Sequence, residues 1–193
     1  MKKLSLKKKI VTASATVIVG ALAIGGTAAY FTAKGTARNV ITTGNIEIAL
    51  LESKINDQGE KVPFEDVLGV MPGEKVSKIV EVENTGGQSA WIRVSVDKEI
   101  ELAEGTEGEV DTSLVTYDLN EEYWTESDGY YYYKDVLKSG ETTQPLFTKV
   151  SFEKEMGNLY QNSKAVVTVN AYATQAANNG SNVFEAAGWP AED

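Results

Sequence analysis

The sequence predicts an all-β protein, a jelly-roll-like β-sandwich of about seven or eight strands with short helices. The first observation is the hydrophobic pattern, which alternates with a period of two in most apolar segments. The second is the spacing of glycine, proline and asparagine turns, which recur roughly every ten residues between those segments. Such alternation is typical of strands that bury one face.

Residues 1–29 have the composition of an export signal and are expected to form a signal helix. Five lysines precede an apolar or small-residue run, residues 10–26, that carries no charge. Thr27 and Ala29 supply the small side chains that a signal peptidase accepts before the scissile bond. We therefore expect cleavage between Ala29 and Tyr30.

An uncleaved membrane anchor is the alternative for the same segment. Residues 10–31 are about long enough to cross a bilayer, which takes roughly 20 residues. The run is rich in Ala, Gly, Thr and Ser, however, and lacks the density of large apolar side chains found in strong anchors. The composition therefore favours cleavage.

The expected mature chain is one domain with a strong negative charge. Removing residues 1–29 leaves 164 residues, which is enough for a single domain with a substantial core. Thirteen basic and 28 acidic residues remain, a net charge of −15. This charge argues against nucleic acid as a partner and leaves membrane contact to the signal segment before cleavage. We expect a donor or extension segment at 30–45 and the sandwich at 46–193.

The chain contains no histidine and no cysteine. Ser-His-Asp and Cys-His catalytic pairs therefore cannot be built, and the usual ligands of zinc are missing. Acidic residues lie mostly in turn-like runs, such as 99–111, which lacks the spacing of a calcium loop. Export without disulfides fits a Gram-positive surface. We predict no catalytic, metal-binding or cofactor-binding residues.

The strand pattern appears in five segments, residues 45–51, 75–84, 91–102, 143–155 and 165–176, and turn residues separate them. Pro72-Gly73 precedes the second segment, and Gly86-Gly87 separates the second from the third. Lys78 interrupts the apolar face of the second segment, which indicates an edge strand or a bulge. Short helices are expected only at 64–69 and 153–160. The residues expected to face the core are, in chain order, Ile46, Ile48 and Leu50; Val76, Val80 and Val82; Ile92, Val94 and Val96; Leu146, Thr148, Val150 and Phe152; and Val167, Val169, Ala171 and Ala173.

Asp128-Gly129 predicts a hairpin turn ahead of four consecutive tyrosines, residues 130–133. Alternate tyrosines of a strand point to opposite faces, so one pair should enter the core and the other should cover a sheet face. Trp91, Trp124 and Trp189 are likewise expected to pack. A carbohydrate-binding surface is the alternative for these rings, and it would make the protein a monomeric adhesin or glycan-binding module.

Three stretches together resemble the TasA/camelysin family of Gram-positive exported proteins. In "IGGTAAYFTAKGTARNVITTGNIEIAL" a Gly-Gly-Thr, an aromatic pair and a polar spacer precede a Gly-x-Ile-x-Ile-like strand. "VMPGEKVSKIVEVENTGGQSAWIRVSV" has a Pro-Gly turn, a strand, an Asn-x-Gly turn and a second strand. "VVTVNAYATQAANNG", followed by "EAAGW", resembles the end of the family's domain.

The resemblance implies a jelly-roll domain, export through a dedicated signal peptidase and assembly into extracellular matrix fibres. In such fibres the N-terminal segment of one subunit fills a groove in the next, so the main partner is a second copy. A co-exported accessory matrix protein is a further expected partner. Camelysin has also been classed as a metallopeptidase, an activity that the missing histidines argue against.

The segment after the cleavage site is the predicted assembly element. A sandwich with an open edge exposes unpaired backbone groups that a strand from a neighbour can complete. Tyr30 and Phe31 are the expected apolar anchors of this donor strand, with Val40 and Ile41 as a second pair nearer the folded body. A head-to-tail contact of this kind is open-ended and gives filaments. The alternative is a frayed terminus with no role.

Overall fold

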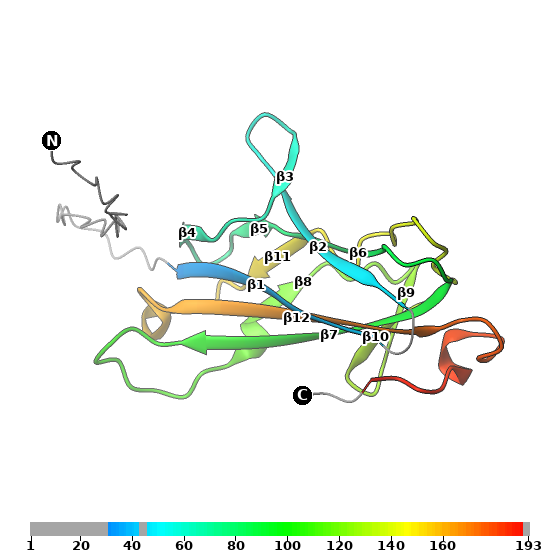
Figure 1. The fold of residues 1–193 in the computed structure, drawn as a ribbon. Helices are drawn as coiled ribbons and strands as arrows, with labels where there is room; N and C mark the ends of the chain where they lie inside the picture. The colour runs from blue at the N-terminus through cyan, green and yellow to red at the C-terminus, as the bar shows by residue number, and fades with distance from the viewer. Residues whose placement is uncertain (1–30, 43–45, 191–193) are drawn as a thin grey trace, which may run out of the picture.

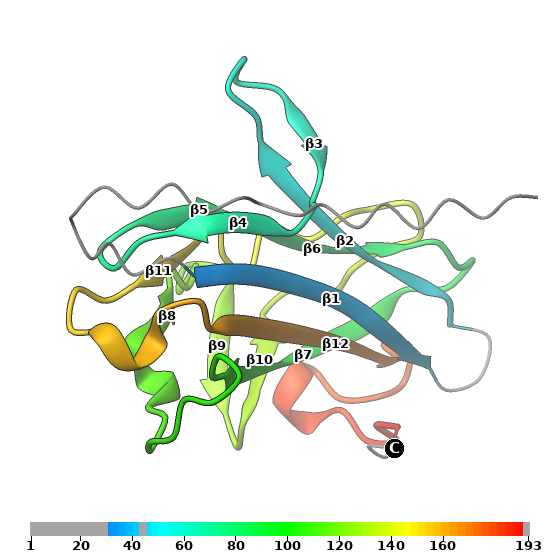
Figure 2. The same cartoon turned by 90° about the vertical axis from the view of Figure 1, so that its left-hand side faces the viewer.

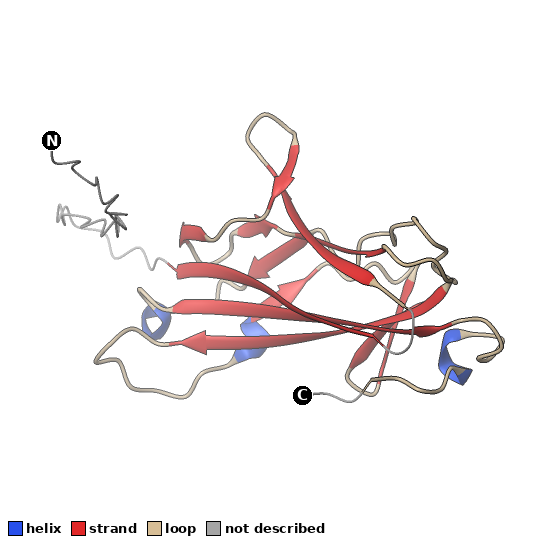
Figure 3. Ribbon diagram, in the orientation of Figure 1, coloured by secondary structure: helices blue, strands red, loops and turns tan. Residues whose placement is uncertain are grey.

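The computed structural model describes residues 31–42 and 46–190, which form a two-layered β-sandwich (Figure 1). The predicted signal segment and the expected cleavage site, Ala29 and Tyr30, lie outside the described residues. Three short 3₁₀ helices, η1 (Thr112–Leu114), η2 (Asn158–Tyr160) and η3 (Val183–Glu185), lie between or after strands (Figure 3). The strands are β1 (Phe31–Thr42), β2 (Ile48–Ile55), β3 (Lys61–Pro63), β4 (Val67–Val70), β5 (Lys75–Ser77), β6 (Ile79–Asn84), β7 (Ala90–Glu101), β8 (Val115–Tyr117), β9 (Trp124–Ser127), β10 (Tyr130–Tyr133), β11 (Lys149–Phe152) and β12 (Lys164–Gln175).

One layer is a six-stranded sheet in the order β4-β1-β12-β7-β10-β9 (Figure 2). The other layer consists of two three-stranded sheets, β5-β11-β8 and β3-β2-β6. Residues 141–148 join them by pairing with β6, where Thr143 N–H donates to Val82 C=O at 2.9 Å. All strand pairs of the described residues are antiparallel except β1 with β12. The prediction of an all-β sandwich with short helices is confirmed.

A two-stranded arm, residues 53–63, projects from the second layer (Figure 1). Strand β2 pairs with β6 as far as Ser53. It then leaves the layer and pairs with β3, with Lys54 opposite Val62 and Ile55 opposite Lys61. Because β2 departs there, it does not continue alongside β5, which directly precedes β6 in the chain.

The apolar faces predicted from the alternation form the core. Most of the expected core-facing residues are buried, while Leu50, Val96 and Thr148 are half-buried. Tyr172 and Thr174 alternate with the core-facing residues of β12, which predicts that they face solvent, yet each is only 3 % exposed. Residues 176–190 fold back over that face, and Thr174 Oγ1 donates to Ala187 C=O at 3.1 Å.

The structure has more strands than the pattern predicts, because several are too short to show alternation. Strands β3, β5 and β8 have three residues each. Residues 64–69, expected as a short helix, instead lead into β4, which pairs with β1. Residues 153–160 contain only the single turn η2. In the first of these segments tertiary pairing therefore overrides local propensity.

The tyrosine hairpin forms as predicted. Ser127 pairs with Tyr130 across the Asp128-Gly129 turn, and both turn residues have positive φ, +50° and +81°. This geometry matches the two-residue turns that favour Asp-Gly. Tyr131 and Tyr133 are buried in the core, and Tyr130 and Tyr132 lie on the outer sheet face.

Candidate functional site

Strand β1 fills a place inside the six-stranded sheet of its own chain. Residues 31–42, which the sequence analysis assigns to an extension outside the sandwich, lie between β12 and β4 (Figure 2). The boundary expected at residue 45 is therefore not a structural boundary in the single chain. We call the space between β4 and β12 that β1 fills the β1 slot.

The two sides of the β1 slot hold the strand unequally. Along β12, β1 is parallel and in register from Thr32 opposite Lys164 to Thr42 opposite Ala173, with a shift between Ala37 and Val40. Along β4, only Phe31 to Ala33 are paired. Beyond Ala33, no strand of the described residues pairs with the outer edge of β1. The start of β1 is thus held on both sides and the remainder on one.

The inner wall of the β1 slot is a fully paired strand with an apolar core face. Strand β12 is paired along its whole length with β7, from Lys164 opposite Glu101 to Gln175 opposite Ala90. Lys164 Nζ also forms an ion pair with Glu101 at 2.6 Å. On the core face Ala33 of β1 lies opposite Ala165 of β12, and both are buried. A strand that enters this slot therefore meets a preformed edge.

Three of the four predicted assembly residues lie in strand β1. Phe31 is opposite Val70 of β4, Val40 is opposite Ala171 and Ile41 is opposite Tyr172. The fourth, Tyr30, lies outside the described residues, as does the bond before it. The prediction that these side chains act as anchors stays a prediction.

A buried ion pair at the base of the arm was missed by the sequence analysis. Lys78 Nζ pairs with Glu52 Oε1, and the two side chains are 2 % and 7 % exposed. The Lys78 ammonium also lies 4.2 Å from the centre of the Phe64 ring. Burial lowers the pKa of Lys78 below its ordinary value, and the Glu52 carboxylate opposes that shift. The interruption of an apolar face by Lys78 was the available signal, and it predicts an edge strand or a bulge rather than a buried ion pair.

The outer aromatic cluster belongs to the packing of residues 176–190. The Arg93 guanidinium lies 3.8 Å from the Tyr130 ring centre and 4.8 Å from that of Trp189. Tyr132 contacts Trp189 and Phe184 at centroid distances of 6.0 and 5.2 Å. Trp91 and Trp124 are buried. These contacts support the packing interpretation of the rings over the carbohydrate-binding one.

The described residues do not offer the ligands of a metal centre. No group of three or more His, Cys, Asp or Glu side chains in residues 31–42 and 46–190 is arranged to hold an ion. Since histidine and cysteine are absent from the whole sequence, a zinc site would have to rest on carboxylates alone. Among the same residues, no helix is long and apolar enough to cross a membrane.

Comparison with known proteins gave one match. The family model described as camelysin metallo-endopeptidase matches residues 5–111, which is more than half of the chain and includes β1 to β7. Neither a curated protein nor a solved structure matched the chain. With a family match of that extent, the chain belongs to the camelysin family.

Proposed function

We propose that this protein is a secreted structural subunit of extracellular fibres, in which β1 of one copy enters the β1 slot of the next. Export, cleavage between Ala29 and Tyr30, and delivery to the matrix or cell surface of a Gram-positive bacterium are parts of the proposal. The observation that carries it is the placement of β1 as a parallel strand beside β12.

Strand exchange is supported by how β1 is attached. Only residues 43–47 connect β1 to β2, so β1 can turn outward while β2 keeps its pairing with β6. A neighbour's β1 would then make the same contacts that β1 makes within one chain. Exchange of identical elements therefore has a low free-energy cost, and its extent rises with protein concentration.

The contact is heterologous, because the donated strand and the accepting slot are different surfaces. Such contacts continue from copy to copy unless a rotation closes a ring. The mature charge of −15 opposes close approach of subunits. At physiological ionic strength the Debye length is about 8 Å, and repulsion between charges farther apart than this is largely screened. Assembly should therefore increase with added salt.

A disulfide that ties β1 to β12 tests the proposal. Ala33→Cys and Ala165→Cys place two thiols on opposed, core-facing positions. Opposed residues of neighbouring strands are roughly 4.8 Å apart, within the roughly 4.4–6.8 Å range of disulfide Cα distances. The chain has no other cysteine, so one bond is possible. We expect the oxidised form to remain unassembled in negative-stain electron microscopy and the reduced form to make filaments.

The matched control places a disulfide between strands that stay together during exchange. Ser95→Cys with Asn170→Cys joins β7 to β12, where the two native side chains are 3.2 Å apart. This oxidised control should assemble normally. Filaments of the oxidised Ala33–Ala165 variant in equal amount to the control would refute strand exchange.

The family description also names a metallo-endopeptidase, which is the alternative function. Because histidine and cysteine are absent and the described carboxylates form no metal cluster, we expect no chelator-sensitive cleavage of casein by the purified protein. Cleavage that stops with EDTA and returns with zinc would contradict this expectation.

A further inference from the structure

We infer that a groove between β4 and β5 is a second self-association surface, in which the arm (residues 53–63) of one copy enters the groove of another. The groove has a volume of about 490 Å³. It is lined by residues 54–57 at the end of β2, by all of β4 and by residues 74–77 around β5. It does not involve the β1 slot on the other side of β4, so the inference goes beyond strand exchange.

The groove exists because β2 leaves its layer for the arm. Strand β4 ends the six-stranded sheet, and β5 ends the β5-β11-β8 sheet. Both therefore present an outer backbone edge with no neighbouring strand among the described residues. Two such edges facing one gap are the arrangement that an added strand completes.

Exposed apolar side chains gather around this gap. Leu68 and Ile55 line the groove and are 76 % and 45 % exposed, and Met71 follows at the end of β4 with 38 % exposure. Of the described residues, the other strongly exposed large apolar side chains are Val110 and Phe184. A cluster of this kind marks an interaction surface more than singly scattered residues do.

The walls of the groove are fixed in advance. Ile55 N–H donates to Ser77 Oγ at 2.9 Å, which ties the arm to β5. Gly73 N–H donates to Phe152 C=O at 2.6 Å and holds the turn between β4 and β5 against β11. The buried Lys78–Glu52 pair supports the base of the arm. A preformed groove loses little conformational entropy on binding.

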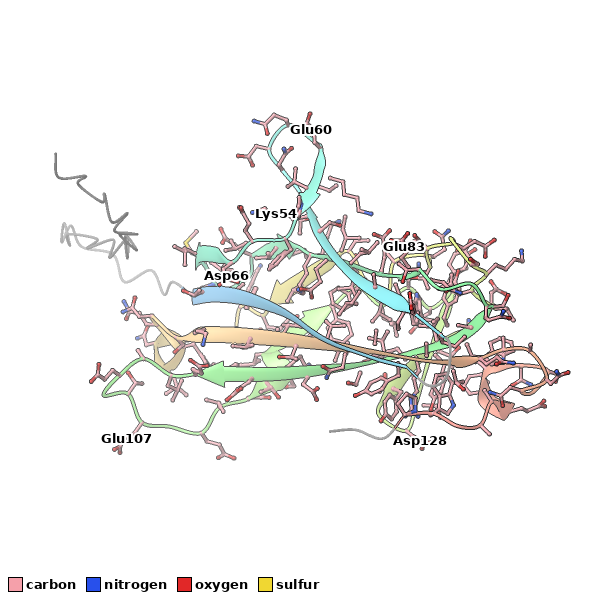
Figure 4. The ribbon with its side chains drawn as sticks, in the orientation of Figure 1. Lys54, Glu60, Asp66, Glu83, Glu107 and Asp128 are labelled. Atoms are coloured by element: carbon pink, nitrogen blue, oxygen red, sulfur yellow. The ribbon has the colours of Figure 1, made fainter. Side chains whose placement is uncertain are left out.

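The arm of a second copy offers an unpaired strand edge to the groove and an acidic tip to Lys75. It is a narrow ribbon, and its outer strand β3 ends the β3-β2-β6 sheet with an unpaired edge. Its tip carries the exposed acids Asp57 and Glu60 (Figure 4). Lys75 on the groove wall is exposed and forms no ion pair with the described residues. Asp57 and Glu74 also line the groove, and Glu74 Oε2 accepts a hydrogen bond from Met71 N–H within the turn. Arm and groove adjoin, so in two copies related by a two-fold axis each arm tip can enter the groove of the partner.

The location separates this contact from strand exchange. The groove is lined by β4, which pairs with residues 31–33 at the start of β1. Strand β1 ends and β2 begins at the opposite end of the sandwich (Figure 1). Molecules joined by strand exchange therefore keep the arm and groove free. The arm contact would link such chains side by side.

Sedimentation velocity of the oxidised Ala33→Cys/Ala165→Cys form is the test, because that form cannot exchange β1. We expect a reversible monomer–dimer equilibrium. Leu68→Asp should raise the dimer dissociation constant at least about tenfold, since it leaves a charge desolvated in an apolar contact. Phe184→Asp, at an apolar site on η3 that is 54 % exposed and lies away from the groove, should leave the constant unchanged. Lys75→Glu should weaken the dimer, and adding Glu60→Lys should restore it.

Failure of this inference is distinct from failure of strand exchange. A locked protein that stays monomeric up to its solubility limit, or a dimer that Leu68→Asp and Phe184→Asp affect equally, overturns the arm contact. Both substitutions lie on the surface, so matching thermal unfolding of the two variants shows that folding is not the cause. Filament formation by the reduced protein is scored separately and reports on strand exchange.

Discussion

A peptide of residues 30–42 is expected to restore a stable fold to a chain that starts at Gly44. The shortened chain lacks β1, which pairs with β12 through nine opposed positions and with β4 through three. Each backbone hydrogen bond contributes on the order of 1 kcal/mol net. Because a whole domain is stable by only roughly 5–15 kcal/mol, the loss of a strand is a large fraction of the total. We expect the shortened chain to unfold near room temperature or without cooperativity.

The peptide should reverse that loss, since it presents in trans what a neighbour would donate. At a free peptide concentration of about 100 times the dissociation constant, the gain is roughly 2.7 kcal/mol. Circular dichroism at increasing peptide concentration measures the shift of the unfolding temperature. A shortened chain that folds equally well alone would show that β1 is dispensable and would remove the basis for donation.

Two proline-containing peptides provide a matched comparison. Thr32 N–H donates to Ser163 C=O at 3.0 Å, so the amides of Lys34 and Thr36 face β12 by the period of two. Thr36→Pro removes one of these donors and should weaken binding. Gly35→Pro removes an amide on the opposite edge, where no described strand pairs, and should be tolerated. Equal binding of the two peptides would contradict the register of β1.

Replacing Lys78 by methionine is expected to destabilise the fold by roughly 3–5 kcal/mol. The substitution leaves the Glu52 carboxylate, which is 7 % exposed, without its partner. It also removes the cation above the Phe64 ring. Denaturant unfolding of the purified variant measures the change in free energy.

The double variant Lys78→Met with Glu52→Leu removes both buried charges. It shows whether the cost of the single variant comes from the unpaired Glu52 carboxylate. With both charges removed and similar volumes kept, stability should return to the wild-type value or exceed it, because no buried charge remains to be desolvated. Lys138→Met is the matched control. Lys138 pairs with Glu141, and the two side chains are 72 % and 48 % exposed, so its loss should cost no more than about 1 kcal/mol. A small cost for Lys78→Met alone would show that water reaches the pair.

The arm depends on this pair in a specific way. Glu52 lies on β2 directly before the arm begins, and Lys78 lies between β5 and β6 at the point where β2 departs. Phe64 N–H donates to Glu52 C=O at 3.1 Å, which brings the returning chain to the same place. The buried charges thus mark where one strand leaves a layer. An apolar substitute would fill that space without fixing the departure point, a role for buried polar groups that other proteins attest.

The sequence alone determined the apolar faces of five strand segments, the turn of the tyrosine hairpin and the absence of histidine and cysteine. A period of two fixes the faces of a strand, and Asp128-Gly129 fixes a turn, because both depend on neighbouring residues only. The absence of histidine and cysteine is a matter of composition. The resemblance to the TasA/camelysin family was also visible there, and the family match over residues 5–111, which contains the first two of the three stretches, confirms the family.

Only the tertiary structure decided the neighbour of each strand. Strand β1 lies beside β12, the last strand of the chain, and no local pattern in residues 31–42 specifies a partner so distant in sequence. The same holds for Lys78, whose partner Glu52 is supplied by another strand. Alternation in the sequence defines the two faces of a strand. Its two edges consist of backbone N–H and C=O groups, which every residue shares. Which strand pairs with each edge therefore depends on how the whole core packs.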